Sequence, residues 1–172
     1  MSVGYIYGNR TNSGHTDHGM VVRDAIDAVC KYGDCVNTLF PYNEEVPDII
    51  KRFNDAVVEL FPKAYENRFT SFYYARGETA IKSALINYGP VVFSIKWFDD
   101  AYVDKDGILR SEYKSSDSYH CMVIYGWNKT GWKIQNSWGT GWGIEGRAIM
   151  PYDFPLSESW VIMDEYSKRL QE

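Results

Sequence analysis

His120 and Asn136 are the two residues of this chain whose types and spacing indicate chemistry. His120 lies in an apolar, aromatic segment at residues 119–127, and Asn136 directly follows a second such segment at residues 132–135. Turn-forming residues at 128–131 separate the two segments, so the pattern predicts a strand, a turn and a second strand. Histidine gains and loses a proton near neutral pH, so the pattern favours general acid–base catalysis.

The second strand runs into the sequence Asn136-Ser137-Trp138-Gly139-Thr140-Gly141-Trp142-Gly143. This order and spacing resemble the papain-like cysteine peptidases. The resemblance implies that Asn136 orients the imidazole of His120, that Trp138 shields their hydrogen bond from water, and that the imidazole pairs with a cysteine thiolate. Two alternatives stay open: a histidine that only fills the core, and an asparagine that only caps a strand. The glycines after Trp138 indicate a tight loop on either interpretation.

Other segments also resemble that family in order, and the resemblance covers nearly the whole chain. Residues 19–42, 78–92 and 107–109 resemble segments of the family in general. Residues 2–10, 150–153 and 159–162 resemble its bacterial, archaeal and viral branch. The resemblance implies substrate-binding roles for Gly19, Met20, Val21, Tyr119 and Cys121. Tyr119 and Cys121 stand where the family has smaller side chains beside its histidine, so both should reshape the main specificity pocket.

The resemblance also implies a nucleophilic cysteine at the start of a helix upstream of the histidine, and we find no such residue in the sequence. Residue 1 falls just after the place where that helix ends in the family. Two hypotheses follow: a peptidase whose nucleophile segment is missing from this chain, and a pseudopeptidase that binds a peptide or protein without cleaving it. The sequence favours inactivity of the 172-residue chain by itself.

The chain has three cysteines, and none fits the nucleophile's environment. Cys30 lies near the C-terminal end of a predicted helix, where the helix dipole opposes a thiolate. Cys35 follows Asp34, whose charge raises a thiol pKa. Cys121 neighbours His120 on a strand, so their side chains should point to opposite faces. A core or loop role is expected for all three, and their odd number argues against a disulfide framework.

Helical spacing predicts three helices. The first lies near residues 19–32, the second begins at Pro47 and is closed by Pro62, and the third lies at residues 78–88. Asp17 is the expected N-cap of the first helix, and Gly33 its expected terminator. Strands are predicted at residues 69–75, 91–95, 107–109, 121–127, 132–136, 147–150 and 159–163, and the start of the chain is also strand-like. Helices followed by mainly antiparallel strands indicate an α+β class.

We therefore expect a single papain-like domain over residues 1–172. Residues 1–90 should form a mainly helical, incomplete N-terminal part, and residues 91–172 an antiparallel sheet or barrel that carries His120 and Asn136. The missing helix should leave an apolar groove, lined by the 19–32 helix and by the strands at 91–95 and 121–125. The groove should bind a separate N-terminal segment, drive self-association of the chain, or be covered by local refolding.

Composition restricts the classes of partner that the chain could bind. The net charge is −5, with 18 basic and 23 acidic residues interspersed, which argues against nucleic acid. No apolar run is long enough to span a membrane, and no basic, apolar leader opens the chain, which favours a cytoplasmic location. His15, Asp17 and His18 lie close together, but no second ligand cluster accompanies them, so no metal and no cofactor is expected. The class of partner that is still expected is a peptide or a protein, bound either as a substrate or as a ligand.

Overall fold

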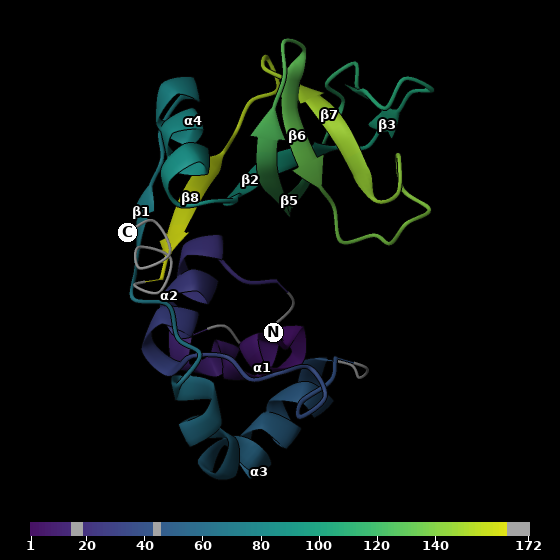
Figure 1. Cartoon of the computed structure of the whole chain (residues 1–172). Helices are drawn as coiled ribbons and strands as arrows, with labels where there is room; N and C mark the ends of the chain where they lie inside the picture. The colour runs from purple at the N-terminus through teal and green to yellow at the C-terminus, as the bar shows by residue number, and fades with distance from the viewer. Residues whose placement is uncertain (15–18, 43–45, 165–172) are drawn as a thin grey trace. The chain divides into compact units, whose positions relative to one another are not determined.

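The structure, a computed structural model, describes residues 1–14, 19–42 and 46–164. The chain forms two compact units (Figure 1). Among the described residues, the helical unit comprises Met1–Phe72 together with Met163 and Asp164, and the sheet unit comprises Tyr73–Ile162. The sequence pattern places the division between helical and strand-rich parts at residue 90. The structure instead groups the helix before that point with the sheet, because this helix packs on two of its strands.

The helical unit contains α1 (Val3–Gly8), the short 3-10 helix η1 (Asn9–Ser13), α2 (Val22–Tyr32) and α3 (Val46–Tyr65). The strand-like start predicted from the sequence is wrong, since residues 3–8 form α1. Ser2 caps this helix, and its Oγ accepts the N–H of Tyr5 at 2.9 Å. Packing overrides the β-propensity of the segment, because the helix buries Tyr5 to 1% exposure.

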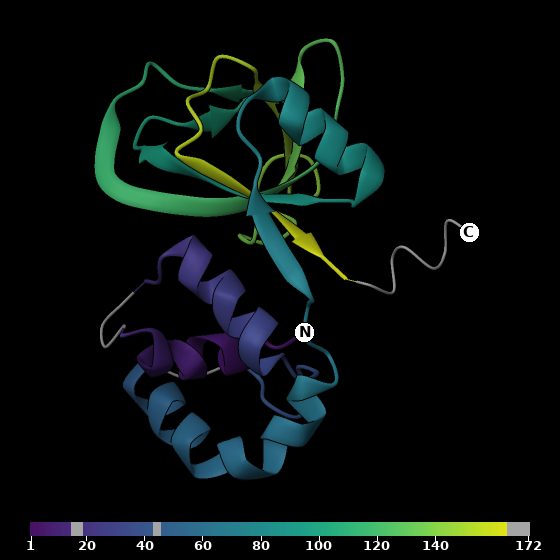
Figure 2. The same ribbon diagram turned by 90° about the vertical axis from the view of Figure 1, so that its left-hand side faces the viewer.

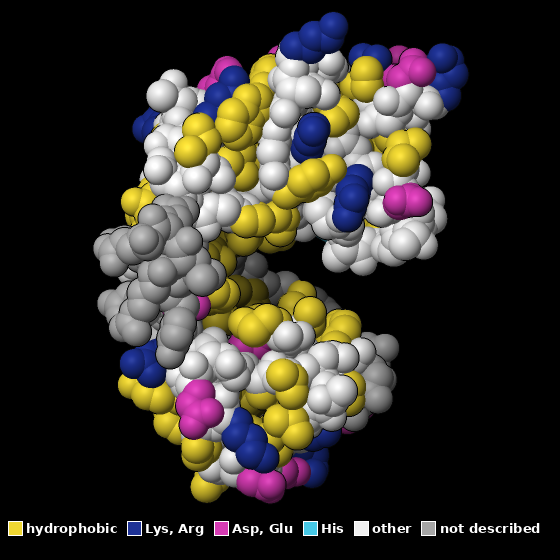
Figure 3. Space-filling view, viewed as in Figure 1, with side chains coloured by type: hydrophobic (Ala, Val, Ile, Leu, Met, Phe, Trp, Pro, Cys, Tyr) yellow, Lys and Arg dark blue, Asp and Glu magenta, His cyan; other side chains and the backbone are white. Residues whose placement is uncertain are grey.

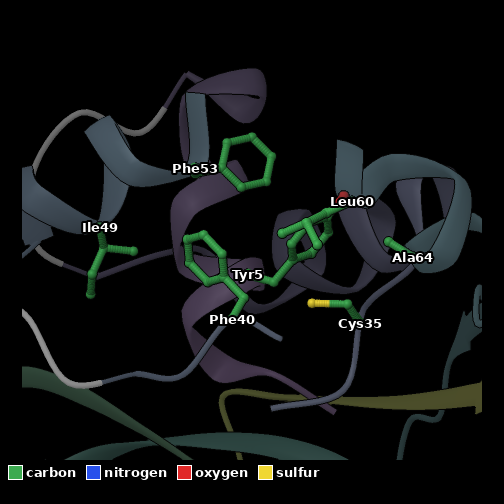
Figure 4. Packing of buried hydrophobic residues seen from close by; sticks show 7 residues of the cluster. All are labelled: Tyr5, Cys35, Phe40, Ile49, Phe53, Leu60 and Ala64. Carbon is green, nitrogen blue, oxygen red and sulfur yellow. The ribbon is translucent and has the colours of Figure 1, made fainter. Parts of the chain in front are cut away.

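One cluster of buried side chains forms the core of the helical unit (Figure 4). The ring of Tyr5 lies edge-on to Phe53, with centroids 5.1 Å apart, and to Phe40 at 6.1 Å. Cys35, Ile49, Leu60 and Ala64 complete the cluster. The core therefore joins α1 and α3 with the segment before Tyr42.

Pro62 lies inside α3, so the predicted end of this helix at Pro62 is wrong. A proline removes one helical N–H, and the carbonyl left without a donor is that of Val58. Val58 is 85% exposed, so water can satisfy that carbonyl. Leu60 and Ala64 are buried on either side of Pro62, and their packing holds the last turn.

Helix α2 begins at Val22, three residues after the predicted start, and its N-cap Val21 makes no side-chain capping bond. The predicted cap Asp17 lies outside the described residues. Gly33 ends the helix as predicted, with a φ of 77°. A Cβ at this position would lie 1.8 Å from the backbone oxygen of Ala64, so only glycine fits where α2 ends against α3.

The sheet unit is built on a sheet in the order β1-β8-β2-β5-β6-β7. Its strands are β1 (Ser71–Tyr74), β2 (Val91–Phe98), β5 (Ser115–Trp127), β6 (Gly131–Gln135), β7 (Arg147–Pro151) and β8 (Glu158–Met163). Helix α4 (Glu78–Asn87) runs alongside this sheet and contacts β2 and β5 (Figure 2). A small second sheet pairs β3 (Tyr102–Val103) with β4 (Leu109–Arg110). The sequence predicts all of these strands except β3, which is short and lacks an apolar run.

Alternation along two paired strands sets the face on which the site lies. Val91, Phe93 and Ile95 of β2 are fully buried. On β5, Met122 and Ile124 are also buried, and they pair with Phe93 and Val91. His120 pairs with Ile95 and continues the same alternation, so its side chain leaves the sheet on the apolar face.

Lys and Arg side chains on the sheet unit are scattered among acidic and apolar ones on the face that Figure 3 shows. The sequence pattern predicts the same interspersed charge. Among the described residues, no helix combines the length and the apolar character that crossing a membrane requires.

Candidate active site

The imidazole of His120 and the carboxamide of Asn136 lie within hydrogen-bonding distance of each other. Nε2 of His120 lies 2.8 Å from Oδ1 of Asn136. His120 stands on β5, and Asn136 directly follows β6, its antiparallel neighbour. The turn between these strands is held by Asn128, whose Oδ1 accepts the N–H groups of Thr130 at 2.8 Å and Gly131 at 3.1 Å. The structure thus brings together the two side chains that the strand–turn–strand pattern predicts to meet.

The hydrogen bonds of Asn136 define the tautomer of the neutral imidazole. Its Oδ1 also accepts the backbone N–H of Ser137 at 2.7 Å, which identifies this atom as an acceptor. Nε2 of His120 is then the donor, and the ring's lone pair lies on Nδ1. Nδ1 is therefore the atom that can take a proton from a reacting group.

Hydrogen bonds fix Asn136 at its backbone N–H, its backbone carbonyl and its side-chain oxygen, and the residue is only 4% exposed. Its backbone N–H donates to the carbonyl of Gly146 at 3.0 Å. Nε2 of Gln135 donates to that same carbonyl at 3.0 Å and to the carbonyl of Asn136 at 3.1 Å. Gln135 and Gly146 are thus site residues that sequence reasoning missed. The position of Gln135 next to Asn136 was the one available signal.

Two tryptophans pack against the imidazole. The ring of Trp138 lies 4.6 Å from that of His120 with an interplanar angle of 33°. Trp97 of β2 meets His120 edge-to-face, with centroids 5.1 Å apart at 79°. The sequence pattern predicts the contact of Trp138 but not that of Trp97. Its placement depends on how β2 and β5 are paired, which residue spacing does not give.

A glycine-rich loop follows Trp138, as the sequence predicts. Gly139 and Gly143 have φ values of 79° and 57°. A Cβ on Gly143 would lie 2.3 Å from the backbone oxygen of Arg147. Glycine is therefore required for the loop to return to β7, whatever the chemistry of the site.

Tyr119 and Cys121, the predicted substrate-binding neighbours of His120, lie on the opposite face of β5. Tyr119 is 67% exposed, and Cys121 is also exposed. Cys121 pairs with Ser94 on β2, and Ser94 in turn pairs with Glu158 on β8. Ser94 Oγ donates to Glu158 Oε1 at 3.1 Å. A polar row therefore borders Cys121 on the face away from the imidazole.

Gly19, Met20 and Val21, the other predicted substrate-binding residues, belong to the helical unit and precede α2. Gly19 is exposed and has a φ of 80°. Its carbonyl accepts a hydrogen bond from Nη2 of Arg10, a fully buried residue of η1. Val21 is 50% exposed. The side chain of Arg10 therefore fixes the main chain of this segment, and Gly19 and Val21 remain exposed.

The other two cysteines, Cys30 and Cys35, both lie where the pKa of a thiol is raised. Burial, with a smaller contribution from Asp27, raises the pKa of Cys30 to about 11. Burial and the charge of Asp34 also raise the pKa of Cys35, which is 1% exposed. A catalytic cysteine needs a lowered pKa, so both environments act in the opposite direction.

In the part of the chain that the structure describes, no group of three or more His, Cys, Asp or Glu side chains is placed to hold a metal ion. The loop cluster of His15, Asp17 and His18 lies outside the described residues.

Comparisons with known proteins agree with the geometry. The family model described as "Papain family cysteine protease" matches residues 12–154. Mouse cathepsin O is 32% identical over 87 residues, which is 46% of this chain and 27% of cathepsin O. An uncharacterized peptidase C1-like protein of Acanthamoeba polyphaga mimivirus is 28% identical over 179 residues, covering 93% of this chain and 58% of the viral protein.

A solved structure with a similar fold is also that of a cysteine protease. The structure of xylellain, a cysteine protease from Xylella fastidiosa, superposes with a TM-score of 0.77 at 23% identity, and the match covers 95% of this chain and 69% of xylellain. The predicted α+β papain-like fold is thereby confirmed. The chain spans from about a quarter to somewhat over half of the length of these curated relatives. The match of the family model over most of the sequence shows that the chain belongs to the papain family of cysteine proteases.

Proposed function

We propose that His120 and Asn136 form the acid–base half of a Cys-His-Asn peptidase site, and that the nucleophile is supplied by a segment outside these 172 residues. The observation that carries the proposal is the 2.8 Å contact between His120 Nε2 and Asn136 Oδ1, which leaves Nδ1 as the basic atom. Trp138 covers the imidazole and limits access of water to this bond, which strengthens it.

In the proposed reaction, Nδ1 of His120 takes the proton of an incoming thiol, and the thiolate attacks the carbonyl carbon of the scissile peptide bond. The imidazolium then gives that proton to the leaving amine, which breaks the C–N bond and leaves a thioester. Water attacks the thioester after losing a proton to the same imidazole, and the thiol leaves with that proton. Asn136 holds the ring through both proton transfers.

None of the three cysteines of this chain is the proposed nucleophile. Cys30 and Cys35 have raised pKa values, so thiolate forms less readily than in an ordinary cysteine. Cys121 directly follows His120 on β5, and adjacent strand side chains point to opposite faces. We therefore propose that the chain by itself does not hydrolyse peptides.

The proposed substrate is an extended peptide. Its main chain would pair with the exposed backbone around Gly19, because main-chain hydrogen bonding needs no particular side chain. Met20 and Val21 would add apolar contacts to the bound peptide. Tyr119 and Cys121 lie on the face of β5 away from the imidazole, so we do not propose that they contact the scissile peptide. The retained imidazole and carboxamide favour this peptidase over the second candidate, a pseudopeptidase that binds a peptide or protein without cleaving it.

The first test uses the purified chain with a fluorogenic peptide and with an epoxide that alkylates active-site cysteines. We expect no hydrolysis and no labelling. Stoichiometric labelling of Cys30, Cys35 or Cys121 that disappears in the His120→Ala variant would overturn the proposal, because it would identify a resident nucleophile.

The second test adds a synthetic segment with the sequence pattern Gln-Gly-x-x-Gly-Ser-Cys followed by an apolar helical stripe. We expect binding by calorimetry and cleavage of the fluorogenic peptide in trans. Both the His120→Ala variant and a segment with serine in place of its cysteine should remove the cleavage while leaving the binding. Binding without any cleavage supports the non-catalytic alternative. Absence of binding would reject complementation by this segment. Light scattering would then show whether the chain is a monomer or self-associates.

A further inference from the structure

We propose that Trp97 is a positioning residue for His120, which together with Trp138 prevents the imidazole from rotating away from Asn136. The inference rests on the proposed function, since it concerns the orientation that the acid–base role needs. Trp97 lies neither in the strand that carries His120 nor in the loop that carries Asn136, and it reaches the site from β2.

The register of β2 against β5 changes at Trp97, between Lys96 and Phe98. Lys96 pairs with Tyr119, but Phe98 pairs with Ser115, whereas a continued regular register would pair Phe98 with Asp117. Irregularities of this kind redirect side chains and often occur beside active sites. Here the irregularity coincides with an indole that contacts the imidazole.

The rings of Trp97, Trp138 and His120 contact one another in a closed group. Their centroids are 5.1 Å apart for Trp97 and His120, 4.6 Å for Trp138 and His120, and 4.9 Å for the two tryptophans. The three distances form a nearly equilateral triangle, so Trp97 does not lie opposite Trp138. It packs against the imidazole beside Trp138, with its ring nearly perpendicular to the imidazole at 79°.

This placement restricts the one rotation that would break the hydrogen bond to Asn136. The bond between Cβ and the ring of a histidine has a broad torsional preference, so the side chain alone does not fix the ring. The hydrogen bond to Asn136 also competes with water, and Trp138 is 51% exposed. Two indoles on adjacent sides block rotation where one would leave a free path.

The test compares Trp97→Leu, which removes the ring but keeps an apolar side chain, with Trp97→Phe, which keeps an aromatic ring. Trp160→Leu is the matched control, because Trp160 is a half-buried tryptophan of the same sheet that makes an edge-to-face contact with Tyr74. Thermal unfolding of all three variants measures the general loss of packing.

The readout is the imidazole N–H of His120 in the purified chain labelled with ¹⁵N-histidine, whose only other histidines are His15 and His18. We expect Trp97→Leu to speed exchange of this proton with water by about tenfold, with Trp97→Phe changing it by less than about threefold. Trp160→Leu should leave the exchange unchanged even if its melting temperature falls as far as that of Trp97→Leu. Unchanged exchange in Trp97→Leu, or equal acceleration in Trp160→Leu, overturns the inference.

A second readout is the cleavage reconstituted with the cysteine segment. Trp97→Leu should lower kcat by about tenfold with KM unchanged, because the reacting geometry and not substrate binding is affected. A tenfold rise in KM with kcat unchanged would contradict the inference. If no cleavage is reconstituted but the exchange result holds, the proposed peptidase function fails while Trp97 keeps its role in positioning the ring.

Discussion

Nε2 of His120 and Oδ1 of Asn136 lie 2.8 Å apart although the two residues are not directly opposite each other in the sheet. Gln135 pairs with Val123, so a continued register would set Asn136 opposite Met122, two residues beyond His120. The contact is therefore a diagonal one, within the reach of long side chains on neighbouring strands. It depends on the turn that fixes the register of β5 against β6.

Replacing Asn136 by alanine should free the imidazole and destabilise the sheet unit. The change leaves the N–H groups of Ser137 and His120 without their acceptor, which should cost about 1–3 kcal/mol of unfolding free energy. Chemical denaturation measures the loss, and ¹⁵N shifts of His120 should reveal a mixture of tautomers. Asn128→Ala is the control, because Asn128 also accepts two N–H groups, both of them from the backbone, and these come from Thr130 and Gly131 rather than from His120. A single unchanged tautomer in Asn136→Ala would contradict the role assigned to this residue.

Cys30 should react with alkylating reagents more slowly in the folded chain than in the unfolded one. Its pKa is raised to about 11, so the thiolate fraction at pH 8 is far below that of an ordinary cysteine. We expect alkylation by iodoacetamide to be at least about tenfold slower at pH 8 than in denaturant, and to rise with pH until about 11. Mass spectrometry of the peptide that contains Cys30 gives the rate. Reaction as fast as in denaturant would place Cys30 among candidate nucleophiles again.

Asp34 should make the chain less stable as the pH rises. Its side chain is fully buried, and burial raises its pKa from 3.8 to about 6, although the N–H of Ser2 donates to it at 2.8 Å. The folded state therefore holds the proton more tightly than the unfolded state. The resulting stability is complete below about pH 3.8 and is lost as the pH passes about 6, a change of up to about 3 kcal/mol.

The Asp34→Asn variant tests this linkage because an amide does not titrate. Between pH 4 and 7, denaturation of the unaltered chain should show a loss of stability that the variant lacks. Asp48→Asn, at an exposed position of the same unit, should retain the pH dependence of the unaltered chain. An equal pH dependence in Asp34→Asn would assign the loss to other groups.

Gly33→Ala should destabilise the helical unit by about 3 kcal/mol or more. The new Cβ would meet the backbone oxygen of Ala64 at 1.8 Å, in addition to the strain of a φ of 77°. Gly14→Ala separates these effects, because Gly14 has a φ of 79° but no described residue lies within 4 Å of an added Cβ. We expect this control to cost only about 1–2 kcal/mol by thermal or chemical unfolding. Equal losses in the two variants would mean that the contact with Ala64 is readily relieved.

The sequence by itself determined the hairpin that carries the site. Turn residues at 128–131 and alternation on either side define two strands and their connection, and these local signals place His120 and Asn136 at its open end. The glycine that ends α2 and the helix α4 were also predictable, because a positive φ and a helical apolar stripe are properties of short segments.

Only the tertiary structure decided the state of residues whose environment comes from distant parts of the chain. Residues 3–8 are strand-like in composition, yet burial of Tyr5 against Phe40 and Phe53 makes them helical. Pro62 does not end α3, because buried neighbours on both sides outweigh the lost hydrogen bond. Trp97 reaches His120 because β2 pairs with β5 and then leaves its register. Periodicity assigns a side chain to a face of its own strand or helix, but which side chain meets it there depends on strand pairing and packing, which no local pattern encodes.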